Sequence, residues 1–149
     1  MGHDDKVASA TLDIAAPADR IFELIADPAR QPTWDGNDNL AEAAEGQRVH
    51  AVGDVFTMML HKGAMRENHV VEFEEGRLVA WRPSEPGLAP PGHLWRWELM
   101  PLDDSHTRVT HTYDWSELTD EKRMVRARAT DRDALMSSVR RLAAAAERA

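Results

Sequence analysis

Residues 93–115, HLWRWELMPLDDSHTRVTHTYDW, decide the fold, because large apolar side chains alternate with polar ones on both sides of a turn signal. Alternation with a period of two is typical of strands that bury one face. A turn centred on Asp104 pairs Trp97 with His111, so both aromatic rings lie on the same face of a hairpin. The same register pairs Trp95 with Tyr113 and Leu99 with Val109.

Three segments before this hairpin alternate in the same way, over residues 55–62, 66–74 and 77–82. The steps Gly63-Ala64 and Glu75-Gly76 separate them, as hairpin turns do. We therefore predict an antiparallel meander. The pairs that these two turns predict are Leu60–Glu67, Met58–His69, Phe56–Val71, Val71–Trp81 and Phe73–Val79.

The predicted sheet has one polar and one apolar face, so one side meets water and the other meets the core. The polar face carries side chains such as Arg66 and Asn68. The apolar face is expected to hold Phe56, Met58, Leu60, His69, Val71, Phe73, Val79, Trp81, Trp95, Trp97, Leu99, Val109, His111, Tyr113 and Trp115.

The segment before the meander predicts a strand and two short helices. Residues 7–14 alternate as a strand. Pro17 is suited to the start of a helix, and Pro28 ends that helix because the residue before a proline is pushed out of the helical region. A second helical turn is expected over residues 29–34, and a weakly patterned strand over residues 40–52.

Residues 118–147 contain no proline or glycine and predict one long helix with Thr119 as its cap. The face of this helix that meets the sheet has few large apolar side chains. It carries Ala127, Arg128, Asp131 and Ser138 where a packed core needs Leu or Ile. A wide aromatic sheet under such a helix predicts an internal cavity for an apolar ligand. The alternative is that the tryptophan rings fill the space themselves.

Composition limits the class of protein. A length of 149 residues is enough for one domain over residues 1–149, with an ordered core over about 7–147. Hydrophobic residues make up 42% of the chain, which is ordinary for a globular protein. No apolar run is long enough for a membrane span, and the first residues lack the apolar region of a signal peptide, so a cytoplasmic protein is expected.

The charge balance and the motifs exclude several functions. Asp and Glu outnumber Lys and Arg by 26 to 18, which disfavours nucleic-acid binding. The absence of cysteine excludes disulfides and thiolate chemistry. The histidines lack metal-ligand spacing, and no glycine-rich nucleotide motif is present, so we expect no metal and no cofactor.

Four stretches resemble the SRPBCC or START-like superfamily, the polyketide cyclase/dehydrase and lipid-transport group. They are AAPADRIFELIADPARQPTW at residues 15–34, VGDVF at 52–56, VEF at 71–73 leading to LVAW at 78–81, and TRVTHT at 107–112. The resemblance covers residues 7–147. It implies an α+β helix-grip fold of the bacterial type: a curved seven-stranded antiparallel sheet wrapped around a long C-terminal helix, with two short helices after the first strand and a hydrophobic pocket in between.

Four side chains are weak catalytic candidates. His69 and His111 are predicted to point inward, where an imidazole can act as acid or base or can remain a hydrogen-bonded core residue. Tyr113 can donate to a ligand oxygen or reach the pocket rim. A carboxylate at Asp131 can act as acid or base over a cavity, unless this half of the helix is solvated.

The remaining candidates are predicted to contact a ligand. Arg128 can pair with Asp131 or orient an anionic ligand, and Trp34, next to Asp35, either lies at the pocket mouth that the resemblance implies or packs under the loop. The complete predicted ligand-binding set is Trp34, Phe56, Met58, His69, Val71, Trp81, Trp95, Trp97, His111, Tyr113, Arg128, Asp131 and Leu135.

The leading functional prediction is binding of a hydrophobic, ring-containing small molecule by a monomer or homodimer. Residues 35–39 and 83–92 are expected to act as lids over the pocket mouth. Two alternatives remain open. One is a cofactor-independent aromatic polyketide cyclase or dehydratase, and the other is a protein-interaction module of the chaperone-activator kind.

Overall fold

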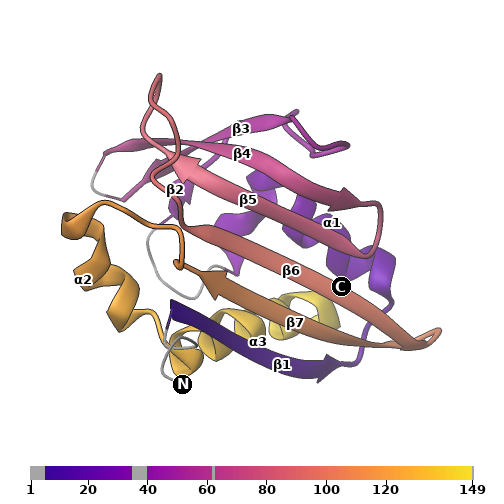
Figure 1. Ribbon diagram of the computed structural model, residues 1–149. Coiled ribbons are helices and arrows are strands. Elements are labelled where there is room, and N and C mark those ends of the chain that lie inside the picture. Colours follow the sequence, from indigo (N-terminus) through magenta and orange to yellow (C-terminus); the bar gives the residue numbers. More distant parts are fainter. Residues whose placement is uncertain (1–5, 35–39, 62, 149) are drawn as a thin grey trace.

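The computed structural model describes residues 6–34, 40–61 and 63–148, and an antiparallel sheet forms its centre (Figure 1). Six strands of six to ten residues make up most of this sheet. The strand predicted over residues 40–52 is reduced to the three-residue β2 (Leu40–Glu42) at the edge. The other strands follow β2 in the order β3 (Val55–Leu60), β4 (Met65–Glu74), β5 (Leu78–Ser84), β6 (Leu94–Asp103), β7 (His106–Asp114) and β1 (Val7–Ile14).

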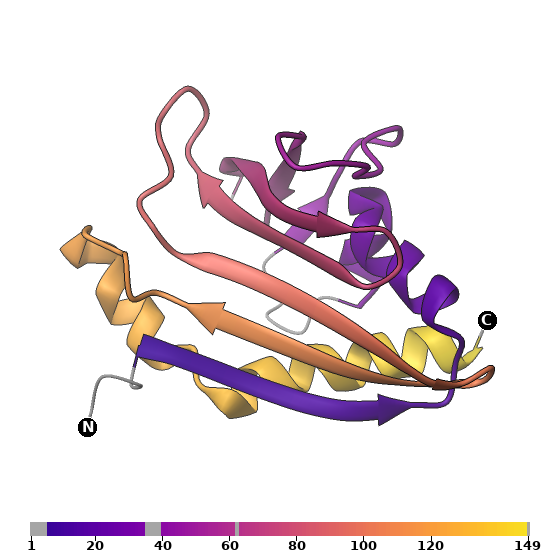
Figure 2. The same ribbon diagram turned by 45° about the vertical axis from the view of Figure 1, so that its right-hand side comes forward.

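The helices lie on one face of the sheet. Two short helices follow β1, as predicted: α1 (Ala18–Ala26) and the 3-10 helix η2 (Pro28–Thr33). The chain ends in α2 (Glu121–Ala129) and α3 (Arg132–Arg148), and α3 packs against β1, β7 and α1. Figure 2 shows α3 along the sheet and α2 beyond its end.

The single helix predicted over residues 118–147 is wrong, because side-chain hydrogen bonds divide it. The helix begins after Asp120, whose carboxylate accepts from the backbone N–H of Lys122 at 2.9 Å, so Asp120 is the cap and not Thr119. At the break, the Thr130 hydroxyl donates to the Arg126 carbonyl. Asp131 then accepts from the Ala134 N–H at 3.0 Å and starts a new helix.

The predicted register of the β6–β7 hairpin is confirmed, and Trp97 lies opposite His111. The register of the β3–β4 hairpin is wrong, because Met58 pairs with Arg66 and not with His69. The cause is a longer loop: the Leu60 N–H donates to the Ala64 carbonyl at 2.8 Å, so three residues, 61–63, connect the paired strands instead of two.

A β-bulge at Val71 changes the register within β4, so that the residues after it face the sides that the sequence predicts. Val70 lies opposite Trp81 while Glu72 lies opposite Ala80, so Val71 is the extra residue. After the bulge the predicted pairing of Phe73 with Val79 is confirmed. Before the bulge every side chain of β4 has the opposite facing from the one predicted.

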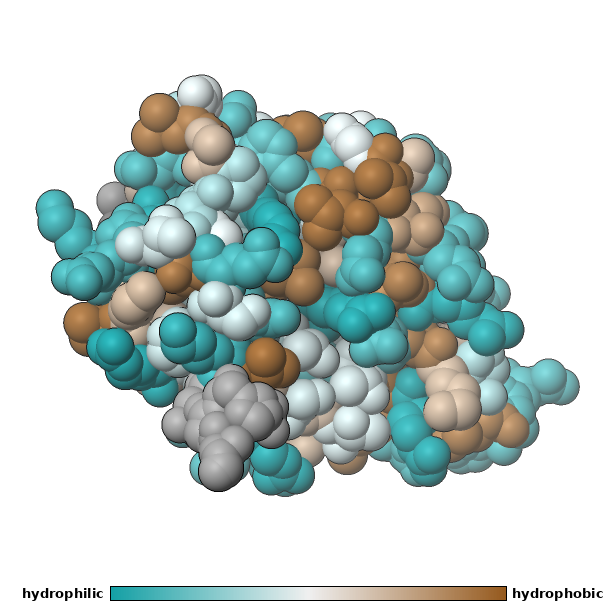
Figure 3. Space-filling view, in the orientation of Figure 1, coloured by the Kyte–Doolittle hydropathy of each residue, from teal (hydrophilic) through white to brown (hydrophobic). Residues whose placement is uncertain are grey.

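The two faces of the sheet otherwise divide as predicted. On the inner face, Asn68 and Val70 of β4 are buried in the places predicted for His69 and Val71. Phe73 is partly buried and contacts Phe22 of α1 edge-on, with ring centroids 5.8 Å apart. The face turned away from α3 is mostly hydrophilic, with separate small apolar patches (Figure 3).

Candidate ligand-binding cavity

A cavity of about 530 Å³ lies between the inner face of the sheet and the helices α2 and α3. Drug-sized ligands occupy cavities of roughly 300–1,000 Å³. The space exists because α3 presents the small side chains Ala134 and Ser138 to it, where a filled core needs larger ones. The predicted cavity is therefore present, and the tryptophan rings do not fill it.

Aromatic rings form the sheet wall of the cavity. The Trp97 and His111 rings stack with centroids 3.7 Å apart and planes 14° apart. Trp95 lies over Tyr113 with centroids 4.3 Å apart. Trp34 of the η2 end meets Trp97 edge-on at 5.2 Å, so rings from distant parts of the sequence converge on one wall.

His111 is a neutral imidazole in this wall. Its Nδ1 lies 3.0 Å from the Arg96 carbonyl oxygen, which can only accept, so Nδ1 carries the proton and Nε2 has the lone pair. Full burial lowers the pKa of His111 to about 3 against the opposing effect of this hydrogen bond. The ring therefore accepts hydrogen bonds through Nε2 and carries no charge near neutral pH.

Tyr113 remains a phenol in the same wall. Burial raises its pKa to about 12, and the opposing effects of Arg126 and Arg123 are smaller. Its hydroxyl hydrogen is therefore retained at any physiological pH, and it can donate to a ligand oxygen.

Three nitrogen atoms in the cavity wall are buried and have no protein hydrogen-bond partner within the described residues: Asn68 Nδ2, Trp97 Nε1 and His93 Nδ1. Asn68 is 3% exposed and Trp97 1% exposed. The indole N–H of Trp34, by contrast, donates to the Leu24 carbonyl at 2.8 Å. A buried donor without a partner costs about 1–3 kcal/mol, so a ligand with oxygen acceptors gains by meeting these groups.

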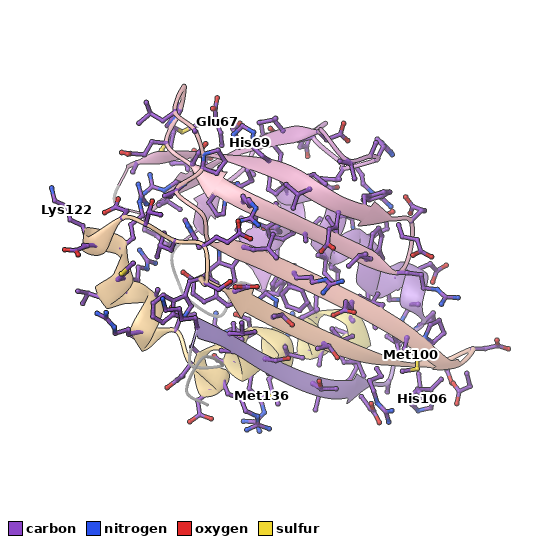
Figure 4. The ribbon with its side chains drawn as sticks, viewed as in Figure 1. Glu67, His69, Met100, His106, Lys122 and Met136 are labelled. Carbon is purple, nitrogen blue, oxygen red and sulfur yellow. The ribbon has the colours of Figure 1, made fainter. Side chains whose placement is uncertain are left out.

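Positive side chains surround the outer part of the cavity. Its lining includes Arg66 from β4 and Lys122, Arg123 and Arg126 from α2, and no Asp or Glu of the described residues. Lys122 and Arg126 are exposed, so the cavity opens to solvent beside α2. Figure 4 shows Lys122 at the outer tip of this helix.

His93 lies at the same end of the cavity. Burial is the largest cause that lowers its pKa, to about 4, and the charges of Arg123, Arg66, Arg126 and Arg82 add to the effect. Its ring contacts Tyr113 with centroids 6.1 Å apart. His93 is therefore a neutral group between the aromatic wall and the cationic rim.

The connection between β5 and β6 lies at the same end of the molecule as α2 (Figure 2), and Pro83, near the end of β5, lines the cavity. Arg82 donates to the Gly92 carbonyl at 2.7 Å, and Arg123 of α2 pairs with Glu85 at 3.3 Å. The first contact ties the end of the predicted lid over residues 83–92 back to β5, and the second joins this lid to α2. The other predicted lid, residues 35–39 with Asp35, lies outside the described residues.

The structure brings seven of the predicted ligand-binding residues together in the cavity lining: Trp34, Met58, Trp81, Trp95, Trp97, His111 and Tyr113. Phe56 and Leu135 are buried in the neighbouring core and do not line the cavity. The Phe56 ring meets Trp81 edge-on at 5.3 Å.

The other four predicted residues lie elsewhere. The register of β4 places His69 on the outer face, where Nε2 is 3.0 Å from the Ser84 hydroxyl (Figure 4), and leaves Val71 exposed. Arg128 is exposed, with its guanidinium 5.9 Å from the centre of the Trp115 ring. Asp131 is exposed and caps α3, so it does not pair with a ligand inside the cavity.

Sequence reasoning missed several lining residues. Arg66 and Asn68 are predicted on the polar face, and the three-residue loop before β4 turns them inward. Lys122, Arg123 and Arg126 of α2 are absent from the predicted set, because the sequence pattern predicts one continuous helix. Aspartates at helix starts, Asp120 and Asp131, are the sequence signal that separates α2 from α3.

Two further observations concern metals and membranes. Among the described side chains, no group of three or more His, Asp or Glu lies close enough together to hold a metal ion. None of the helices in the described part of the chain combines the length and the apolar character that crossing a membrane requires.

Known proteins resemble this chain in sequence and in fold. A curated but uncharacterized protein of Mycobacterium tuberculosis is 30% identical over 110 residues, which is 72% of this chain and 46% of that protein. The chain thus spans a little under half the length of this relative. Two solved structures share the fold: a START superfamily protein from Mycobacterium smegmatis (TM-score 0.68, 15% identity, 95% of this chain and 97% of that one) and the Zhui aromatase/cyclase from Streptomyces sp. R1128 (TM-score 0.66, 18% identity, 95% and 93%).

The sequence model of one family matches residues 6–147, which is nearly all of the chain. The resemblance seen in the four sequence stretches is thereby confirmed. The chain belongs to the polyketide cyclase/dehydrase and lipid transport family.

Proposed function

We propose that this protein binds a hydrophobic, ring-containing small molecule in the cavity between its sheet and its C-terminal helices. The observation that carries the proposal is the cavity of about 530 Å³ with an aromatic wall and buried nitrogen atoms that lack protein partners. Flat rings suit this wall because stacking on tryptophan adds to the burial of apolar area. The nitrogens favour a ligand that carries oxygen atoms on its rings.

A titration with a neutral fluorescent ring compound, 1-pyrenebutanamide, tests this function. Binding brings pyrene close to the tryptophans, so energy transfer from tryptophan to pyrene rises and saturates. Ala134→Phe fills the cavity from α3 and should weaken binding at least about tenfold, since an occupied cavity excludes the ring. Ala144→Phe places the same side chain on the exposed face of α3 and should leave binding unchanged. Equal binding by both variants contradicts the proposal.

Cofactor-independent cyclisation or dehydration is the second candidate, and the presence of a neutral His111 and a protonated Tyr113 in the same cavity lining favours it. Nε2 of His111 can take a proton from a carbon next to a ketone, and the Tyr113 hydroxyl can donate to the enolate oxygen. The pKa of about 3 makes this imidazole a weak base, which favours binding over catalysis.

Proton exchange separates the two candidates. If His111 is a base, the protein accelerates deuterium exchange next to the carbonyl of α-tetralone in D2O, and His111→Gln abolishes the acceleration while the affinity for the ketone is kept. Asp131→Asn is the control, because Asp131 lies outside the cavity. If exchange proceeds at the rate seen without protein, the enzymatic candidate is wrong and binding remains.

A further inference from the structure

The cavity has an apolar end and a positively charged end. Trp97 and Trp81 are buried at the sheet wall, while Arg126 is exposed on the α2 wall. The whole chain carries a formal net charge of −8. A cluster of cations around the mouth of one cavity is therefore a local feature and runs against the overall charge.

The cations differ in whether a carboxylate neutralises them. Arg123 is held by Asp120 at 3.0 Å and by Glu85 at 3.3 Å. Among the described residues, Arg126 has no ion pair with a carboxylate and no hydrogen bond to one, and the hydrogen bond of Arg66 goes to the Met65 carbonyl at 3.0 Å. Two of the guanidinium groups that line the cavity thus retain their capacity to bind an anion.

The position of Arg66 adds an independent argument. Arg66 lies on the inner side of β4, across the cavity from α2, and its half-buried guanidinium faces Arg123 and Arg126. Loss of hydration is the largest cause that lowers its pKa. The charge of Arg123 adds to the effect, the charge of Glu85 opposes it, and the charge of Arg126 adds a smaller amount. Like charges that face one another across a cavity are stabilised when an anion lies between them.

We propose that the natural ligand is an anionic amphiphile, whose rings lie against the tryptophans and whose carboxylate or phosphate lies at the mouth between Arg66 and Arg126. This inference rests on the ligand cavity proposed above and adds that the ligand carries a negative charge. A guanidinium pair suits such a group because each can donate two parallel hydrogen bonds to it.

Three probes with the same ring and chain test the charge: 1-pyrenebutyrate, the neutral 1-pyrenebutanamide and 1-pyrenebutylammonium. Their dissociation constants are measured by fluorescence anisotropy at low and at high NaCl. The carboxylate should bind about tenfold more tightly than the amide, and the ammonium more weakly than the amide. High salt should reduce this preference, because the mouth is open to solvent.

Variants of Arg126 locate the effect. Arg126→Gln should remove most of the preference for the carboxylate over the amide, while Arg126→Glu should favour the ammonium probe. Arg140→Gln, on the exposed face of α3, is the matched control and should change nothing. The exposed position of Arg126 makes its substitution harmless to folding.

The outcomes separate the two proposals. Equal affinities for carboxylate and amide contradict the anionic ligand but leave the ring cavity in place. Binding of the carboxylate that is insensitive to Arg126→Glu and to Arg66→Gln places the anion elsewhere and also contradicts the inference. If none of the three probes binds, the ligand cavity itself is contradicted.

Discussion

Burial shifts the pKa values of single side chains in the cavity and so fixes their protonation state near neutral pH. His111 is the clearest example: its Nδ1–H is held by the Arg96 carbonyl, and its ring is stacked against Trp97. The carbonyl favours the charged form, but the loss of water outweighs it, so the pKa of His111 falls to about 3. An unfolded histidine has a pKa of about 6.5.

This difference predicts a pH-dependent stability. Between pH 7 and pH 5 the unfolded chain takes up a proton at His111 that the folded protein cannot accept, so the free energy of unfolding falls as the pH falls. The contribution of His111 over this range is about 2 kcal/mol, and it is fully present only above about pH 6.5. His111→Gln keeps the donor to the carbonyl but cannot titrate. Urea unfolding at both pH values should therefore show a smaller loss for the variant, and equal losses would contradict the neutral imidazole.

The aromatic part of the site was predictable from the sequence, and the polar part was not. Alternation places Trp95 with Trp97 and His111 with Tyr113, and the turn centred on Asp104 correctly predicts the register that brings the two pairs to one face. The facing of Asn68 depends on the length of one loop, since a change from two to three residues reverses it. Glycine at position 63 is compatible with both lengths, so the sequence does not distinguish them.

At the scale of elements, the bulge in β4 decides which valine is in the core. Val70 is 2% exposed and Val71 38% exposed, although they are adjacent and chemically identical. Val70→Ala should lower the free energy of unfolding by about 2 kcal/mol, and Val71→Ala by less than about 0.5 kcal/mol. Denaturation curves of the two variants measure the difference. A larger loss for Val71→Ala would contradict the observed register and support the one that the two-residue turn predicts.

The mouth of the cavity depends on a close approach of two main chains. Gly92 has a φ of +127°, and a Cβ added to it would lie 2.2 Å from the Glu117 carbonyl oxygen at the start of the α2 segment. Gly92→Ala should therefore cost at least about 2 kcal/mol and disturb the frame of the mouth. Gly87→Ala in the same connection, with φ +79° and open space around its Cβ, should cost about 1 kcal/mol. Thermal unfolding of both variants tests this, and equal costs would mean that the two segments can separate freely.

The division of the C-terminal helix has the same kind of cause as the bulge. No proline or glycine interrupts residues 118–147, so the pattern of apolar residues alone predicts one helix. The break comes from Thr130 and Asp131, whose side chains bond to the backbone in place of a continuous helix. As a consequence of this break, α2 is separate from α3 and places its cations along the mouth of the cavity.

At the scale of the whole molecule, the charge distribution and the cavity act together. Acidic residues outnumber basic ones by 26 to 18, yet the lining described here contains four basic side chains. Such a local field directs anionic ligands toward the mouth, and added salt weakens it. The start of β4, the end of β5 and the helix α2 come from separate parts of the sequence and lie at the same end of the molecule (Figures 1 and 2).

The most direct test of the ligand cavity is an NMR titration of the five tryptophan indole N–H groups with 1-pyrenebutyrate. The Trp97 and Trp95 signals should shift together and saturate, because both rings line the cavity and the Trp97 N–H lacks a protein partner among the described residues. The Trp115 signal should stay in place, because this buried ring is outside the cavity lining. Saturable binding that leaves Trp97 and Trp95 unshifted would contradict the account.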